Sequence, residues 1–201
     1  MKIPHSYSQA KQDQFVFEML VKGPNSQGRF LDVGCSYPVE INNTYALEQL
    51  GWTGVMIDSD PVAIADCRLQ RKAQIIEANS LEFNWNELPG KVFDYLSLDV
   101  DDATSGTLDR MLKHGVEFRV ATIEHDFYRL GDGPRKAMRD MMQVAGYTLL
   151  LGDIASTPGM PYEDWWVHRS IKNIMFDLTP YLTKDTTILP AVPCKPCGAK
   201  R

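Results

Sequence analysis

Short apolar runs alternate with longer stretches of mixed polarity along most of the chain. The runs have about the length of buried strands, and they predict strands at 29–33, 55–57, 74–76, 95–98 and 120–123. The stretches between them have helical spacing and predict helices at 44–50, from Pro61 onward, at 104–113 and at 134–145. This alternation predicts a doubly wound α/β fold, in which a parallel sheet with right-handed crossovers carries helices on both faces.

After residue 145 the pattern changes. Segments 146–152 and 162–168 read as two strands, and a loop rich in Pro and Gly at 156–161 separates them without a helix. Two strands joined in this way favour a terminal antiparallel hairpin at the end of a mostly parallel sheet. A short helix is predicted at 170–182.

Length and composition favour one domain. The chain has 201 residues, of which 44% are hydrophobic and 23% charged, values typical of a soluble globular protein with a substantial core. We therefore expect a single domain over 1–185 and a flexible C-terminal tail over 186–201. The formal net charge of −5 disfavours a nucleic-acid partner held by bulk charge. Because no apolar leader and no run of about 18 apolar residues occurs, a cytoplasmic protein without a membrane partner is expected.

The chain contains four cysteines, which are too few for a disulfide scaffold. In a reducing compartment they are expected to stay as thiols. Cys194 and Cys197 have half the spacing of a zinc site but no second pair, so they are interpreted as tail thiols. Cys35 and Cys67 are interpreted as small residues that face the core.

Polar residues follow the first two predicted strands, where open α/β sheets bind their ligands. Asp32 can accept a hydrogen bond, and Gly34 can let the backbone approach a ligand closely. The dinucleotide pattern G-x-G-x-x-G is absent because Ser36 holds its second glycine position, which disfavours a nicotinamide cofactor. Asp58 can accept hydrogen bonds from both hydroxyls of a ribose, whereas Asp60, just before a proline, suits a helix cap.

The third strand is followed by Asn79 and Ser80, whose amide and hydroxyl could read the edge of an adenine. A simple turn explains these two residues at least as well. Farther along, Trp165 and Trp166 lie beside two acids, as on a ring-stacking or sugar-facing surface. Packing of a tryptophan in the core is the alternative.

The fourth and fifth strands end in acid-rich junctions, whose mutual repulsion predicts a cation, a general base or a nearby arginine. Oxygen ligands from Asp99, Asp101 and Glu124 would suit Mg²⁺. His125 has the intrinsic pKa of a general base. The alternative is that the acids cap the following helices and His125 lies sideways in the turn. In this alternative the capping acids are Asp101, Asp102 and Asp126. The arginines that could neutralise the acidic residues are Arg129 and Arg135.

Several separated motifs together resemble the FkbM-type S-adenosylmethionine-dependent methyltransferases. They are SYSQ at 6–9, QD at 12–13, FLDVGC at 30–35, NNTYALE at 42–48, GWTG at 51–54 and IDSDP at 57–61. The resemblance covers about residues 6–168 and implies a class I methyltransferase sheet of seven strands, the last antiparallel. It also implies S-adenosylmethionine as the cofactor.

The resemblance implies a role for each junction. The cofactor would be bound by Asp32 and Gly34 at its methionine end, Asp58 at the ribose, Asn79 and Ser80 at the adenine, and Asp99 beside the sulfonium. Ser36, where the sequence departs from the commoner glycine-rich loop, is a further cofactor-binding candidate. Related sugar O-methyltransferases hold Mg²⁺ with acids placed like Asp99 and Glu124. The implied activity is O-methylation of a small molecule or glycan, with His125 as base and with Glu124 and Asp99 orienting the substrate or metal.

Two other functions fit the fold class, namely a nicotinamide oxidoreductase and a non-catalytic binding module. Few residues remain for a lid over the acceptor. We therefore expect the acceptor either in a shallow open site walled by 162–166 and 6–13, or enclosed by a second subunit of a homo-oligomer.

Overall fold

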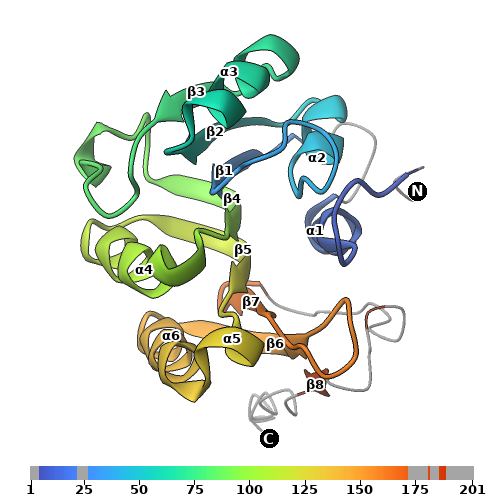
Figure 1. Ribbon diagram of the computed structural model, residues 1–201, viewed down its shortest axis with the longest axis vertical. Helices are drawn as coiled ribbons and strands as arrows, with labels where there is room; N and C mark the ends of the chain where they lie inside the picture. The colour runs from blue at the N-terminus through green and yellow to red at the C-terminus, as the bar shows by residue number, and fades with distance from the viewer. Residues whose placement is uncertain (1–4, 22–26, 172–180, 182–185, 189–201) are drawn as a thin grey trace, which may run out of the picture.

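The computed structural model describes residues 5–21, 27–171, 181 and 186–188. These residues form one sheet with the strand order β3-β2-β1-β4-β5-β7-β6-β8 (Figure 1). The first five strands pair in parallel, and β7 runs antiparallel to both β5 and β6. The strands are β1 (Arg29–Val33), β2 (Thr53–Asp58), β3 (Gln74–Glu77), β4 (Val92–Leu98), β5 (Glu117–Glu124), β6 (Tyr147–Ile154), β7 (Glu163–His168) and β8 (Thr187–Ile188).

This topology confirms the predicted doubly wound, mostly parallel sheet with a terminal antiparallel pair. The seven expected strands are present, and the two-residue β8 adds an edge to β6 that the sequence pattern did not reveal. Most of segment 170–182 and the part of the tail that contains Cys194 and Cys197 lie outside the described residues. The predicted helix at 170–182 and the interpretation of these two cysteines therefore stay predictions.

The helices follow the predicted alternation closely. They are α1 (Gln12–Leu20), α2 (Tyr45–Gln49), α3 (Pro61–Gln70), α4 (Thr104–Lys113), α5 (Phe127–Leu130) and α6 (Asp132–Val144). The carboxylate of Asp60 caps α3 as predicted, since it accepts a hydrogen bond of 2.8 Å from the backbone N–H of Val62. Helices α1 and α5 were not predicted. None of the helices among the described residues is long and apolar enough to cross a bilayer.

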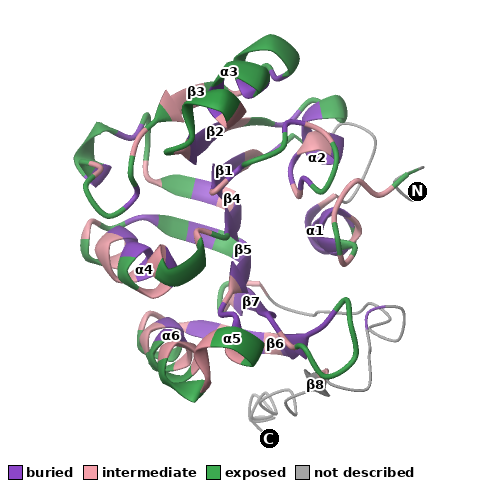
Figure 2. Cartoon of the chain, viewed as in Figure 1, coloured by how far each residue is buried: buried purple, intermediate pink, exposed green. Residues whose placement is uncertain are grey.

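Helices cover both faces of the sheet, with α1 and α2 on one side of the column of strands in Figure 1 and α4 and α6 on the other. Side chains alternate along a strand, so Leu31 and Val33 face the α4–α6 layer while Phe30 faces the α1–α3 layer. The central strands are buried on both faces (Figure 2), which explains why they read as continuous apolar runs.

The two tryptophans of β7 belong to this core. Trp165 and Trp166 are 0% and 1% exposed and point into opposite layers. The ring-stacking surface considered for them is therefore wrong, and the core-packing alternative is correct.

The strand order reverses between β1 and β4, which places a crevice at their carboxyl ends. The backbone is tightest there at Gly34, which has a φ of +84°. A Cβ atom on this residue would lie 1.6 Å from the carbonyl oxygen of Asp99, so the close approach of the backbone after β1 to the backbone after β4 requires glycine at this position.

Candidate functional site

A cavity of about 480 Å³ opens at this switch point. Its lining draws on the segments that follow β1, β2, β3 and β4. The structure brings together there every position predicted to contact a cofactor, namely Asp32, Gly34, Ser36, Asp58, Asn79, Ser80 and Asp99. These positions come from four junctions far apart in the sequence, and the parallel sheet places them at one edge.

Asp58 is held rigidly at the end of β2. Its Oδ2 accepts a hydrogen bond of 2.9 Å from the backbone N–H of Ser36, and its Oδ1 accepts one of 2.9 Å from the N–H of Asp60. Each carboxylate oxygen has a second lone pair, so the fixed side chain retains the capacity to accept hydrogen bonds from a ligand.

The loop after β1 is held in place by the buried side chain of Arg71, a residue that the sequence pattern did not identify. Its guanidinium donates to Pro38 O, Asn42 Oδ1 and Thr44 Oγ1 at 3.0–3.1 Å and forms an ion pair with Glu48 at 3.1 Å. No local motif marks this residue, because its partners lie on another helix and a loop.

Asp32 joins the same network from β1. Its Oδ2 accepts hydrogen bonds from Thr44 Oγ1 at 2.7 Å and from Asn42 Nδ2 at 3.3 Å. Burial raises the pKa of Asp32 despite these bonds. Asp32 therefore both lines the cavity and anchors the loop that forms its wall.

The segment that follows β3 fits both interpretations considered for it, a turn and a place where a ligand could be contacted. Asn79 Oδ1 accepts a hydrogen bond of 2.9 Å from the N–H of Leu81, which is a turn contact. The Ser80 hydroxyl hydrogen-bonds to that of Thr107 at 2.7 Å. Both residues nevertheless line the cavity, and the Asn79 amide NH₂ group keeps its donors.

The acids after β4 and β5 form two linked groups. Asp99 lines the cavity and is hydrogen-bonded to Glu124, and burial raises the pKa of both carboxyls. Beside this pair, carboxylate oxygens of Asp101, Glu124 and Asp126 lie within 4.8 Å of one another, and we call these three residues the oxygen cluster. The predicted metal ligands Asp101 and Glu124 are thus together, but Asp126 takes the place assigned to Asp99.

Two oxygens in the oxygen cluster have no hydrogen-bond partner among the described residues. They are Glu124 Oε2 and Asp126 Oδ1, and the Asp126 side chain is only 4% exposed. A buried carboxylate oxygen without a donor is costly, so this cluster requires a proton, a cation or a ligand group.

Arg129 supplies part of the compensating charge, as the sequence predicted. Its guanidinium contacts Asp102 at 2.7 Å and Asp101 at 3.4 Å, and it also pairs with Asp126. The alternative in which these acids cap the following helices is wrong, because neither η2 (Asp101–Ala103) nor α5 has a side-chain cap. Arg135 lies elsewhere, against Asp132 and Asp153 at 2.8 and 2.6 Å.

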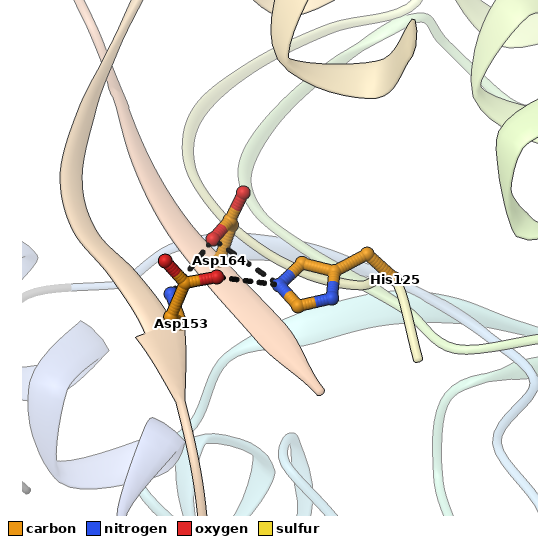
Figure 3. Close-up of side chains that lie close together, drawn as sticks. All are labelled: His125, Asp153 and Asp164. Atoms are coloured by element: carbon orange, nitrogen blue, oxygen red, sulfur yellow. Dashed lines mark hydrogen bonds and ion pairs between the residues drawn. The ribbon is translucent and has the colours of Figure 1, made fainter. Parts of the chain in front are cut away.

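The ring of His125 points at two carboxylates on β6 and β7 (Figure 3). Its Nε2 lies 3.3 Å from Asp164 Oδ1 and 3.8 Å from Asp153 Oδ1, and its Nδ1 accepts a hydrogen bond from the N–H of Phe127. The residue is 2% exposed and does not line the cavity. This geometry argues against the predicted role of His125 as general base.

The Asp164 carboxylate should make stability depend on pH. Burial opposes its ionisation, but the hydrogen bonds from Arg139 and the neighbouring His125 ring outweigh burial and lower the pKa of Asp164 to about 2. The carboxylate therefore stabilises the fold above its ordinary pKa of 3.8, and this contribution disappears as the pH falls toward 2. We expect Asp164→Asn to lower the free energy of unfolding by about 2 kcal/mol at pH 6 and by progressively less toward pH 2. Denaturant titrations across this range check it, and a difference that stays constant with pH would contradict it.

The two segments expected to wall an open acceptor site contact each other. Gln12 Nε2 donates to Glu163 Oε1 at 3.1 Å and to the hydroxyl of Tyr162 at 3.4 Å. The Glu163 carboxyl also accepts a hydrogen bond from the Trp165 indole, and burial raises its pKa to about 8. Gln12 thus packs against Tyr162 and Glu163 in the interior, and neither segment is part of the cavity lining, so an acceptor site walled by 162–166 and 6–13 stays a prediction.

No family model and no curated protein matches this chain. The structure is similar to the S-adenosylhomocysteine-bound methyltransferase PaMTH1 of Podospora anserina, with a TM-score of 0.53 and 17% identity over 70% of this chain and 71% of that one. It is also similar to a TehB-like SAM-dependent methyltransferase of Corynebacterium glutamicum, with a TM-score of 0.51 and 16% identity over 76% and 86%. A third similar structure is the plantazolicin methyltransferase BamL with S-adenosylhomocysteine, with a TM-score of 0.51 and 14% identity over 80% and 84%.

These similarities show the class I methyltransferase Rossmann-like fold, in agreement with the strand order. They do not test the more specific FkbM resemblance, which rests on the sequence motifs alone.

Proposed function

We propose that this chain is an S-adenosylmethionine-dependent methyltransferase that methylates a hydroxyl group of a small molecule or glycan. The observation that carries the proposal is the cavity at the β1–β4 switch point, because it gathers the seven cofactor positions expected from the sequence. The methyltransferase fold supports the same assignment. The acidic surroundings of the site favour a small acceptor over a nucleic acid.

The residues present fit the cofactor. The cavity volume lies within the range of about 300–1,000 Å³ typical of small-molecule sites. Asp58 is fixed by two backbone N–H groups and can accept the ribose hydroxyls, while Gly34 leaves the strand end open to a close approach. The amide of Asn79 can donate to an adenine nitrogen.

When bound, S-adenosylmethionine supplies a methyl group on a positively charged sulfur, and transfer to oxygen is an in-line displacement that depends on alignment. Asp99 lines the cavity and is hydrogen-bonded to Glu124, and burial raises the pKa of both carboxyls. This carboxyl pair can orient the acceptor hydroxyl and take up its proton. We assign this proton transfer to Asp99 and Glu124 rather than to His125.

The oxygen cluster fits Mg²⁺, because it offers only oxygen ligands and two of them are buried without a partner. Asp101, Glu124 and Asp126 would hold the ion. There it would lower the pKa of an acceptor hydroxyl.

Replacement of Asp58 should separate cofactor binding from folding. Asp58→Ala removes the acceptor for the ribose hydroxyls, so we expect its affinity for S-adenosylhomocysteine to fall about 10- to 100-fold in calorimetric titration. The matched control is Asp60→Ala, two residues away and outside the cavity lining, which loses a helix cap but should keep its affinity. Equal affinities of the two variants would contradict the assignment of Asp58.

The metal assignment can be tested without an acceptor. Titration of the protein with Mn²⁺, followed by electron paramagnetic resonance, should show one site whose affinity falls about tenfold or more in Asp126→Asn. Asp140→Asn, which changes an exposed acid on α6, should bind Mn²⁺ like the unchanged protein. If the unchanged protein binds no Mn²⁺, or Asp126→Asn binds it normally, the oxygen cluster is not a metal site.

The acceptor class is tested by incubation with methyl-labelled S-adenosylmethionine and a panel of sugars and hydroxylated small molecules. Label on an acceptor oxygen supports the proposal. Label found only on nitrogen or carbon would contradict O-methylation while leaving the cofactor assignment intact.

A further inference from the structure

Two cysteine thiols meet beside the cofactor cavity. Cys35 follows Gly34 at the end of β1, and Cys67 lies on α3, 32 positions along the chain. Their Sγ atoms are 3.9 Å apart, and the residues are 3% and 0% exposed. They are the free cysteines of the described part of the chain.

One of these thiols is reachable from the cavity although neither is exposed on the outer surface. Cys35 is part of the cavity lining, and Cys67, which is not, contacts it through the two sulfur atoms. A small oxidant that enters the cavity therefore meets Cys35, and a ligand that fills the cavity covers it.

We infer that Cys35 and Cys67 form an oxidation site, at which a hydroperoxide converts the two thiols to a disulfide and thereby disables the cofactor cavity. Formation of the disulfide is inferred from the geometry of the two cysteines alone. The loss of cofactor binding rests in addition on the proposed function.

The reaction balances without any further reactant. The Cys35 thiolate, which lines the cavity, attacks one peroxide oxygen, the O–O bond breaks, and the departing oxygen takes up a proton and leaves as water or an alcohol. The Cys67 thiol then attacks the sulfur of the resulting sulfenic acid, the S–O bond breaks, and a second molecule, water, departs. The two sulfurs together lose two electrons and two protons.

Closing the bond must move the wall of the cavity. A disulfide has an S–S length of about 2.05 Å, so the sulfurs have to approach each other by nearly 2 Å. Cys35 is flanked by Gly34 and Ser36, which both line the cavity, and the Ser36 N–H holds the Asp58 carboxylate. A shift of Cys35 toward α3 therefore displaces the groups expected to grip the cofactor.

The test treats the full chain with hydrogen peroxide, with and without S-adenosylhomocysteine, and follows intact mass, peptide maps and ligand affinity. We expect the treated protein to become two hydrogens lighter, with Cys35 linked to Cys67, and its affinity for S-adenosylhomocysteine to fall about tenfold or more and return on reduction. Ligand present during the treatment should slow the cross-link. Cys67→Ala should keep its affinity before and after treatment, and Cys67→Ser serves if the alanine variant does not fold.

The outcomes separate the two proposals. A protein whose Cys35 and Cys67 stay free under peroxide, or pair with other cysteines, overturns the inference. So does a Cys35–Cys67 cross-link that leaves ligand affinity unchanged. If the reduced protein does not bind S-adenosylhomocysteine at all, the proposed function fails, and the cross-link itself still decides whether the pair is an oxidation site.

Discussion

Replacement of Gly34 by alanine is expected to lower the free energy of unfolding by about 3 kcal/mol or more, because two costs add. The residue has a φ of +84°, which an L side chain rarely adopts. The new Cβ would also lie 1.6 Å from the carbonyl oxygen of Asp99, so the ends of β1 and β4 would have to separate. Denaturant titration measures the change, and binding of S-adenosylhomocysteine should be lost with it.

Gly51 provides the matched control. It has a similar φ of +92°, but a Cβ there would meet no atom within 4 Å. Gly51→Ala therefore pays only the backbone cost and should lose about 1 kcal/mol. If the two variants were equally stable, the close approach of β1 and β4 at the cavity would be refuted.

Replacement of Arg71 by methionine should be the second large effect, with a loss of about 3–5 kcal/mol. The substitution keeps much of the apolar stem but leaves the Glu48 carboxylate buried without its cation, and Pro38, Asn42 and Thr44 lose their donor. Because these partners shape the loop along the cavity, the affinity for S-adenosylhomocysteine should also fall. Thermal or denaturant unfolding and calorimetry measure the two effects.

The double variant with Glu48→Gln distinguishes a buried charge from lost packing. Glutamine can still accept hydrogen bonds from the N–H groups of Lys72 and Ala73 but carries no charge. The double variant should therefore be more stable than Arg71→Met alone. If it were less stable, the unpaired charge would not be the cause of the loss.

The sequence predicts the sheet well because buried parallel strands carry their own signal as apolar runs. The positions of Asp32, Asp58 and Asn79 at the cavity follow from the same signal, since the rule that ligands bind at strand ends needs only the strand boundaries. For these residues local pattern and topology were sufficient.

The orientation of His125 could not be predicted in this way. Its direction is set by Asp153 and Asp164, which reach it from β6 and β7 through tertiary pairing. The role of Arg71 likewise depends on contacts with a loop and a helix that are distant in sequence. Asp126 shows the same limit. Its backbone has a left-handed φ of 46°, and its carboxylate lies near those of Asp101 and Glu124, an arrangement that the spacing of residues in the sequence does not reveal.

The cavity at the β1–β4 switch point is proposed to bind S-adenosylmethionine and not a nicotinamide dinucleotide. The most direct measurement is calorimetric titration of the unchanged protein with S-adenosylhomocysteine and, separately, with NAD⁺. The structure predicts saturable binding of S-adenosylhomocysteine at one site per chain and no binding of NAD⁺. Binding of NAD⁺ without binding of S-adenosylhomocysteine would favour an oxidoreductase, and binding of neither would favour a non-catalytic module. Either result would contradict the assignment of S-adenosylmethionine to this cavity.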